Sequence, residues 1–299
     1  MDTTFDRDTA VRRRAPGGEP ARPDDPAHTT PAGAPSAGEG AATLTAPATA
    51  TFDADVSPDW RAGRGPHGGY LAAMLLRALT ETVADPQRAP RSLTIHYARA
   101  PQPGPVEIRT AIERAGRSLS TLSARMEQDG RLMALALAAF SVPWSAPEIA
   151  ELPLPAVEPP EPRRGEPPPP HPLAPPFARH LELQPRMGTR PFTGAQAPME
   201  VGGWLALAEP RPLDALALAF FSDALFSPPF IRLSEPAVTP TIDLTIHFRA
   251  RVDHGSEHCF ARFTSTTLHE GFFEEDGVIW AADGSVLAQS RQLGIVLAL

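Results

Sequence analysis

The sequence predicts an α+β protein built from two similar halves, and three observations support this fold class. The tetrapeptide Leu-Thr-Ile-His occurs at residues 93–96 and again at 244–247, and the turn pair Asp-Gly at 129–130 recurs at 283–284. Two unrelated matches with nearly the same spacing indicate a duplication. In each half an apolar helix precedes short alternating strands, which is typical of antiparallel sheets and not of βαβ nucleotide-binding folds.

The first half is expected to follow a tail. Residues 1–46 contain almost no aliphatic side chain larger than alanine, so we expect them to be disordered. We assign residues 47–142 to the N-terminal domain. Residues 70–83 are apolar on nearly every side and rich in helix formers, which predicts a buried helix. Alternation and turn signals predict strands at 51–56, 92–99, 106–115, 118–128 and 131–142.

A proline-rich linker separates the halves. Residues 143–176 contain 14 prolines, which favour extended backbone and exclude a helix or a central strand. We assign residues 177–299 to the C-terminal domain. A helix is expected at 212–226, with Pro212 in its first turn. Strands are expected at 177–184, 201–207, 241–249, 259–268, 277–281 and 286–296.

Composition excludes several classes of function. The formal net charge of −8 disfavours binding to nucleic acid or to an anionic membrane surface. No apolar run reaches the roughly 18 residues of a membrane span. The single cysteine, Cys259, rules out an internal disulfide and is expected to be a half-buried strand thiol. A reducing compartment suits this cysteine usage, so we expect a cytoplasmic location.

Short motifs in both halves resemble those of the TesB-like acyl-CoA thioesterases. They are Gly68-Gly69 before the first helix, Thr241-Ile242-Asp243, and Ser290-Arg291-Gln292 near the end of the chain. The resemblance covers residues 51–145 and 177–298. It implies a tandem (double) hotdog fold, with two antiparallel sheets each wrapped around a central helix. It also implies a bacterial enzyme of lipid metabolism that hydrolyses acyl-CoA without a cofactor or a metal, and it allows homo-oligomers of double-hotdog chains.

The resemblance also implies which residues carry the chemistry. In that family an Asp, a Thr and a Gln of the second half hold and activate water, and the matching positions are Asp243, Thr266 and Gln292. Thr264 and Thr267 remain open as alternatives to Thr266. Thioester hydrolysis needs a base to deprotonate the attacking water, and a carboxylate can serve, while an amide and a hydroxyl orient the water.

The start of the first helix is the expected substrate-binding element. Its free backbone N–H groups, at Gly68, Gly69 and Tyr70, can stabilise the oxyanion that forms on the thioester carbonyl, with support from the helix dipole. Glycine at 68 and 69 allows a substrate to approach the backbone closely.

Only one such site is expected in each chain. The first-half position equivalent to Asp243 is Ser92, and the position equivalent to Gln292 is Ala138. His96 and His247 occupy the same place in both copies, which suggests a common packing role.

Other chemistries leave little trace in the sequence. His254 and His258 flank a turn without a second ligand pair, so no metal site is expected. A Gly-x-Ser-x-Gly elbow is missing, which argues against a serine hydrolase. The alternatives to hydrolysis are a non-catalytic acyl-thioester-binding module, favoured if Asp243 faces solvent, and acyl transfer in a biosynthetic pathway. The sequence does not indicate the length of the acyl chain, or whether the acyl group is attached to CoA or to a carrier protein.

Overall fold

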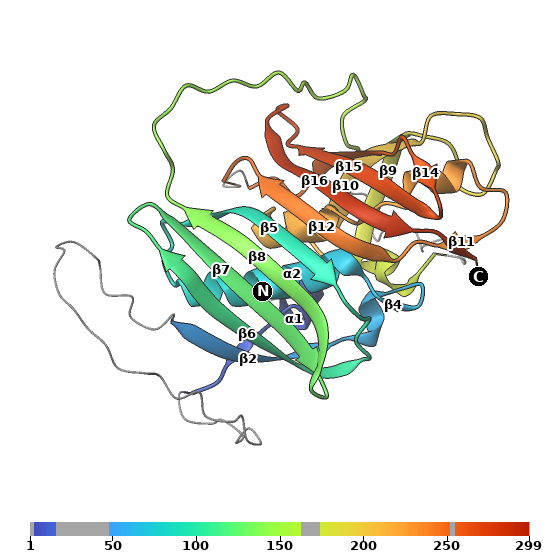
Figure 1. Ribbon diagram of the computed structural model, residues 1–299. Coiled ribbons are helices and arrows are strands. Elements are labelled where there is room, and N and C mark those ends of the chain that lie inside the picture. Colours follow the sequence, from blue (N-terminus) through green and yellow to red (C-terminus); the bar gives the residue numbers. More distant parts are fainter. Residues whose placement is uncertain (1–2, 16–47, 163–173, 252–254, 299) are drawn as a thin grey trace, which may run out of the picture.

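The computed structural model describes residues 3–15, 48–162, 174–251 and 255–298 (Figure 1). The first-half strands are β1 (Arg12–Arg13), β2 (Thr49–Val56), β5 (Ala89–Tyr97), β6 (Gly104–Ala115), β7 (Leu119–Gln128) and β8 (Arg131–Ser141). The second-half strands are β9 (Leu181–Met187), β10 (Glu200–Leu207), β12 (Thr241–Phe248), β13 (Cys259–Thr264), β14 (Leu268–His269), β15 (Phe272–Trp280) and β16 (Val286–Ile295). Two pairs of short strands form separate two-stranded sheets: β3 (Arg61–Ala62) pairs with β4 (Gly65–Pro66), and β11 (Ala237–Val238) pairs with β17 (Leu297–Ala298). Short 3-10 turns lie at Pro58–Trp60, Pro176–His180 and Pro228–Ile231.

One antiparallel sheet runs through both halves. Within the described residues its thirteen strands follow the order β1-β2-β6-β7-β8-β5-β12-β16-β15-β13-β10-β9, with β14 paired to β15. The halves meet where β5 pairs with β12, and Thr94 lies opposite Thr245 with their hydroxyl oxygens 3.1 Å apart. The two sheets expected from the sequence are therefore joined edge to edge. Most strands lie where alternation predicted them, but β15 begins at Phe272, five residues earlier than expected.

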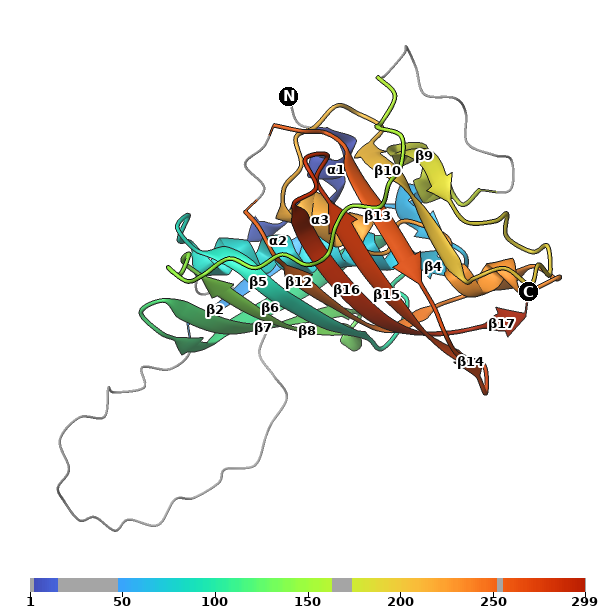
Figure 2. The same cartoon turned by 90° about the horizontal axis from the view of Figure 1, so that it is seen from above.

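The expected buried helix forms as α2 (Gly68–Val83), which crosses the inner face of the first-half sheet (Figure 2). Ala and Leu favour the helical backbone, and the side chains from Tyr70 to Leu76 are at most 3% exposed. The helix ends at Ala84, which adopts the left-handed conformation with a φ of 48°. Neither α2 nor any other helix in the described part of the chain combines the length and apolar character needed to cross a membrane.

The second helix, α3 (Ala215–Phe221), is shorter than the expected helix at 212–226. It begins late because the Asp214 side chain caps it by accepting a hydrogen bond from the N–H of Ala217 at 2.8 Å, which leaves Pro212 outside the helix. It ends where both the N–H and the hydroxyl of Ser222 bind the Leu218 carbonyl. The short α3 packs against α2 and places its last turn beside the start of that helix.

Residues 3–15 are ordered, which corrects the expectation of a disordered tail over residues 1–46. They form α1 (Thr4–Asp8) and β1, whereas residues 16–47 lie outside the described residues. Phe5 is 3% exposed, with its ring 5.7 Å from that of Trp60 and 5.8 Å from that of Phe220. One aromatic side chain thus gives this polar segment a buried anchor between the two halves.

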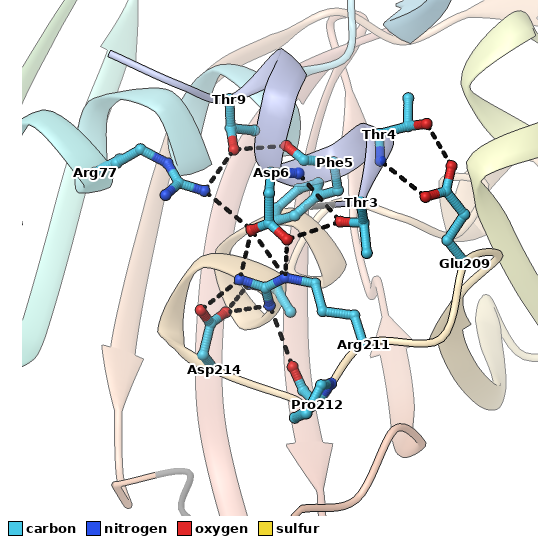
Figure 3. Close-up of polar contacts among 11 residues, drawn as sticks. Thr3, Thr4, Phe5, Asp6, Thr9, Arg77, Glu209, Arg211, Pro212 and Asp214 are labelled. Carbon is cyan, nitrogen blue, oxygen red and sulfur yellow. Dashed lines mark hydrogen bonds and ion pairs between the residues drawn. The ribbon is translucent and has the colours of Figure 1, made fainter. Parts of the chain in front are cut away.

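Ion pairs hold the same segment to both halves (Figure 3). Asp6 accepts hydrogen bonds from the Nε of Arg211 in the second half at 3.0 and 3.1 Å, and it lies 3.3 Å from the NH2 group of Arg77 on α2. Arg77 also donates to the hydroxyl of Thr9 at 2.8 Å. The N-terminal segment therefore bridges α2 and the loop that precedes α3.

The described part of the proline-rich linker lies against the outer face of the second half. The indole N–H of Trp280 donates to the Leu152 carbonyl at 2.9 Å, and that of Trp204 donates to the Glu158 carbonyl at 2.8 Å. Leu154 packs against the same indoles. Residues 143–162 form neither a helix nor a strand, and part of this segment covers an aromatic surface.

Candidate active site

The N-terminus of α2 faces the end of α3 across the boundary between the halves. The N–H of Gly69 donates to Oδ2 of Asp223 at 3.0 Å, and the Tyr97 hydroxyl donates to the Gly68 carbonyl at 2.9 Å. A Cβ on Gly68 would lie 2.7 Å from Asp223, and one on Gly69 would collide with the Phe220 carbonyl. Position 69 therefore requires glycine, because the Phe220 carbonyl belongs to the backbone, whereas at position 68 the Asp223 side chain could move aside. In the free protein a carboxylate oxygen already occupies the place expected for an oxyanion.

His67 fixes this contact between the helices. Its Nδ1 accepts a hydrogen bond from the N–H of Tyr70 at 3.3 Å, and its Nε2 lies 2.8 Å from the Asp223 carbonyl. The ring must therefore carry its proton on Nε2. Burial lowers the pKa of His67, against the raising effect of Asp223, so the imidazole is neutral. The Tyr70 phenol donates to the Asp8 carbonyl at 2.8 Å, away from this contact.

Gln292, on β16, lies in a buried polar cluster of the second half. It is 4% exposed, its Oε1 accepts a hydrogen bond from Thr241 at 2.8 Å, and its Nε2 donates to Oε1 of Glu275 at 2.6 Å. Thr241 reaches Gln292 because a bulge at Ile242 shifts the β12–β16 register, which turns Thr241 to the inner face. Both ends of the amide are thus held in place.

Glu275, on β15, is the buried carboxyl of this cluster. It is 3% exposed, and its Oε2 has no hydrogen-bond partner among the described residues. Burial raises the pKa of Glu275 well above its ordinary value, and the charges of Asp223 and Asp276 raise it further, against the hydrogen bond from Gln292. Asp223 therefore acts on both parts of the site, through its hydrogen bond with Gly69 and through its charge on Glu275.

Asp243, the expected general base, lies on the other face of the sheet. Its neighbour Leu244 pairs with Gln292 and is fully buried, so Asp243 points in the opposite direction. Its own cross-strand partners are His96, which is exposed, and Leu293, which is 36% exposed. The structure does not bring Asp243 and Gln292 together.

Thr266 also lies apart from Gln292. It is exposed after the end of β13, where its N–H donates to Oε1 of Glu274 at 2.7 Å and its hydroxyl binds the same oxygen. The N–H of Thr267 donates to that oxygen at 3.2 Å. The hydroxyl in this stretch that is buried belongs to Ser265.

The remaining candidate groups lie away from the cluster. His96 and His247 are exposed on the outer face, so the packing role expected for them is not observed. Cys259 is fully buried on β13, deeper than expected, and burial raises the pKa of its thiol. His254 lies outside the described residues, within which no group of His, Cys, Asp and Glu side chains is arranged to hold a metal ion.

Two cavities lie around the N-terminal segment. One, of about 450 Å³, is lined by Asp6, Arg211 and neighbouring residues, and the other, of about 350 Å³, by Phe5, Trp60 and His180 among others. Neither is lined by a residue of the Gln292 cluster.

Sequence reasoning missed Asp223, Glu275 and His67. The signal for Glu275 is the alternation from Phe273 through Gly277 to Ile279, which places position 275 on the buried face. His67 directly precedes the two glycines, where a helix cap is expected.

Two models of one protein family match the chain. The acyl-CoA thioesterase N-terminal domain matches residues 56–141, and the acyl-CoA thioesterase C-terminal domain matches residues 155–296. An uncharacterised protein of Mycobacterium tuberculosis is 26% identical over 277 residues, which cover 84% of this chain and 92% of that protein.

Solved structures share the fold. A conserved protein of unknown function with a hot dog fold from Alicyclobacillus acidocaldarius superposes with a TM-score of 0.75 at 23% identity over 100% of both chains. An acyl-CoA thioesterase II, TesB2, from Mycobacterium marinum superposes with a TM-score of 0.63 at 20% identity over 83% of this chain and 93% of that one. The chain therefore has a hotdog fold.

Proposed function

Because the chain belongs to the acyl-CoA thioesterase family, with the N-terminal and C-terminal domains of that family in order, we propose that it hydrolyses acyl-CoA to a free acid and CoA. In this proposal the two domains are a double hotdog with one site at their boundary. The observation that supports it most directly is Asp223, which binds the start of α2 in the first half and acts by its charge on the buried Glu275–Gln292 pair in the second.

The start of α2 supplies the oxyanion site. The Gly69 N–H binds an anionic oxygen in the free protein, that of Asp223. The thioester carbonyl oxygen takes this place as it gains negative charge, and Asp223 turns away. The helix dipole and the fixed backbone N–H stabilise the charge without reorganisation. In this proposal the hydrogen bond from the Gly69 N–H to Asp223 occupies the position of the bond that the same N–H donates to the oxyanion in the transition state.

Gln292 orients the attacking water. Thr241 and Glu275 hold its amide in one orientation, so a water bound to it has a fixed direction toward the carbonyl carbon. The sequence assigned the base to Asp243 and a second water ligand to Thr266, and both lie away from Gln292.

A second candidate function is binding of acyl thioesters without turnover. The outward direction of Asp243 favours it, because a site without its base binds the substrate and leaves the thioester intact.

Release of CoA thiol from short, medium, long and aromatic acyl-CoA separates the two functions. We expect turnover of at least one substrate, and Gln292→Ala should lower kcat more than it raises KM, because the lost contact is made to the attacking water. His247→Gln, a change on the exposed face of β12, should leave kcat within about twofold. Saturable binding of every acyl-CoA tested, with no thiol released from any, would establish the binding module instead.

A further inference from the structure

The N-terminal segment, residues 3–15, contacts both of the helix ends that meet at the candidate oxyanion site. One is the first turn of α2, which carries Gly69. The other is the end of α3, where the Phe220 carbonyl leaves no room for a Cβ on Gly69 and Asp223 accepts the hydrogen bond of the Gly69 N–H. The segment lies outside the residues that match the two family domains, so the family match assigns it no role.

Two hydrogen bonds connect Asp8 to the first turn of α2 and to the ring that packs on it. The Tyr70 phenol donates to the Asp8 carbonyl at 2.8 Å, and the Trp60 indole N–H donates to Oδ2 of Asp8 at 2.7 Å. Trp60 stacks on Tyr70 with ring centroids 5.1 Å apart, and both side chains are fully buried. Breaking such a bond would leave a buried donor unpaired, which destabilises the fold. The position of Tyr70, and of Gly69 before it, therefore depends on Asp8.

Phe5 holds the end of α3 by aromatic packing. Its ring is 5.8 Å from that of Phe220 and 5.7 Å from that of Trp60, and Trp60 in turn meets Phe220 edge to face at 5.3 Å. Aromatic pairs at these distances favour particular relative orientations, so the three rings restrict one another. Phe5 and Asp8 both belong to α1. This one short helix therefore contacts Phe220 on α3 and Tyr70 on α2 at the same time.

The direct hydrogen bond between the helix ends cannot keep them in place during the reaction. In the proposed function the thioester oxygen replaces the Asp223 carboxylate at the Gly69 N–H, so this bond is broken when the transition state forms. The bond between His67 and the Asp223 carbonyl remains, but the helix ends can rotate about a single bond. The contacts of Phe5 and Asp8 include neither Gly69 nor Asp223, so the arrival of substrate leaves them intact.

We propose that Phe5 and Asp8 are positioning residues of the thioesterase site, which fix the Gly69 N–H relative to the end of α3 while substrate occupies the oxyanion position. This inference rests on the proposed function. A displacement of about 1 Å at a reacting group can cost about 10² in rate, so a fixed separation of the helix ends matters for turnover. A segment that only covered apolar side chains would need the burial of Phe5, but not the two hydrogen bonds that Asp8 accepts.

Steady-state kinetics of full-length variants test this role, at a temperature where circular dichroism shows each variant to be folded. Phe5→Ala should lower kcat by about 10² and leave KM within about twofold. Phe5→Leu keeps an apolar side chain against α3 and should retain kcat within about threefold. Tyr70→Phe removes the bond to Asp8 but keeps every backbone N–H of α2, and it should lower kcat about tenfold. Trp280→Phe, the control, removes a buried indole donor on the outer face of the second half and should leave kcat unchanged.

The division of the loss between kcat and KM separates positioning from other roles. If Phe5 lined the substrate pocket, Phe5→Ala would raise KM and leave kcat unchanged. If the segment only stabilised the fold, kcat per folded molecule would be unchanged in both Phe5→Ala and Tyr70→Phe. Either result would overturn the proposal. Should Phe5→Ala fail to fold, Tyr70→Phe decides between the same outcomes.

Hydrogen exchange of individual amides tests the geometry without turnover. In Phe5→Ala the Gly69 N–H should exchange at least about tenfold faster than in the wild type, while amides of β5 and β12 at the junction of the halves keep their rates. Equal acceleration along the whole chain would indicate general destabilisation and contradict the proposal. A wild-type protein that cleaves no acyl-CoA would refute the thioesterase function itself. An active Phe5→Ala protein with unchanged kcat and unchanged Gly69 exchange would refute only the positioning role.

Discussion

Replacing Asp6 with Asn should weaken the attachment of residues 3–15 to both halves. Burial by itself would raise the pKa of the Asp6 carboxyl, but hydrogen bonds from Arg211 and Thr3 outweigh it and lower the pKa from its ordinary 3.8 to about 2. The side chain is 23% exposed, so solvent screens these contacts only in part. At about 1.4 kcal/mol for each pH unit, the lowered pKa corresponds to about 2 kcal/mol of folding free energy.

Urea unfolding followed by tryptophan fluorescence measures this difference. At pH 7 the Asn variant should be less stable by about 2 kcal/mol, or about 3 °C in Tm for a chain of this size. The carboxylate stabilises the fold only while it is ionised, so the difference should be complete above pH 3.8 and disappear as the pH falls toward 2. Glu81→Gln, an exposed change on α2, should stay within about 0.5 kcal/mol. Equal stabilities at pH 7, or a difference that persists at pH 2, would refute the electrostatic origin.

Three other variants test contacts elsewhere. Gly69→Ala should separate α2 from α3, because its Cβ would collide with the Phe220 carbonyl; unchanged hydrogen exchange in α2 would contradict this contact. Trp280→Phe removes the donor to the Leu152 carbonyl and should cost about 1 kcal/mol without changing kcat; an unchanged urea midpoint would show that the linker is not held there. Glu275→Gln should alter the pH dependence of stability. Because the wild-type carboxyl has a raised pKa, the unfolded chain loses its proton first, and stability falls as the pH rises above 4.5. The variant should lack this fall, and equal slopes for the two proteins would exclude a raised pKa.

Local patterns predicted most of the fold. The strand expected at 241–249 forms as β12, and the helix expected at 70–83 forms as α2. Both were predictable because the spacing of apolar residues, every two residues in a strand and every 3.6 in a helix, is visible within one segment. The order of residues 3–15 was not predictable in this way. Phe5 stabilises the segment only through contacts with Trp60 and Phe220, which are distant in the sequence.

The candidate site was only partly predictable. Gln292 was identified, and it lies in the buried cluster. The face of Asp243 could be read from the alternation of Leu244, Ile246 and Phe248, all of which are buried, but the resemblance suggested the opposite role. Glu275 was hidden in an acidic run that looks like an exposed turn. The alternation of buried residues from Phe273 to Ile279, together with the pairing of Glu275 with Gln292, shows that it faces inward.

The β5–β12 junction has the symmetry of a contact between identical subunits. Thr94 and Thr245 are equivalent positions of the repeated tetrapeptide, and they face each other across the junction. Leu93 lies opposite Ile246, as Ile95 lies opposite Leu244, so an approximate two-fold axis passes between the threonines. Such a contact is isologous, as in most dimers.

In a true dimer every substitution enters both subunits at once, so a buried carboxyl acquired in one copy would be buried in the other as well. With both copies on one chain, the second half can carry the destabilising pair of Glu275 and Gln292 while the first half keeps Leu122 and Ala138 at the matching positions. The folding free energy lost by burying polar side chains is then lost in one of the two domains only, and the apolar packing of the other domain stabilises the chain.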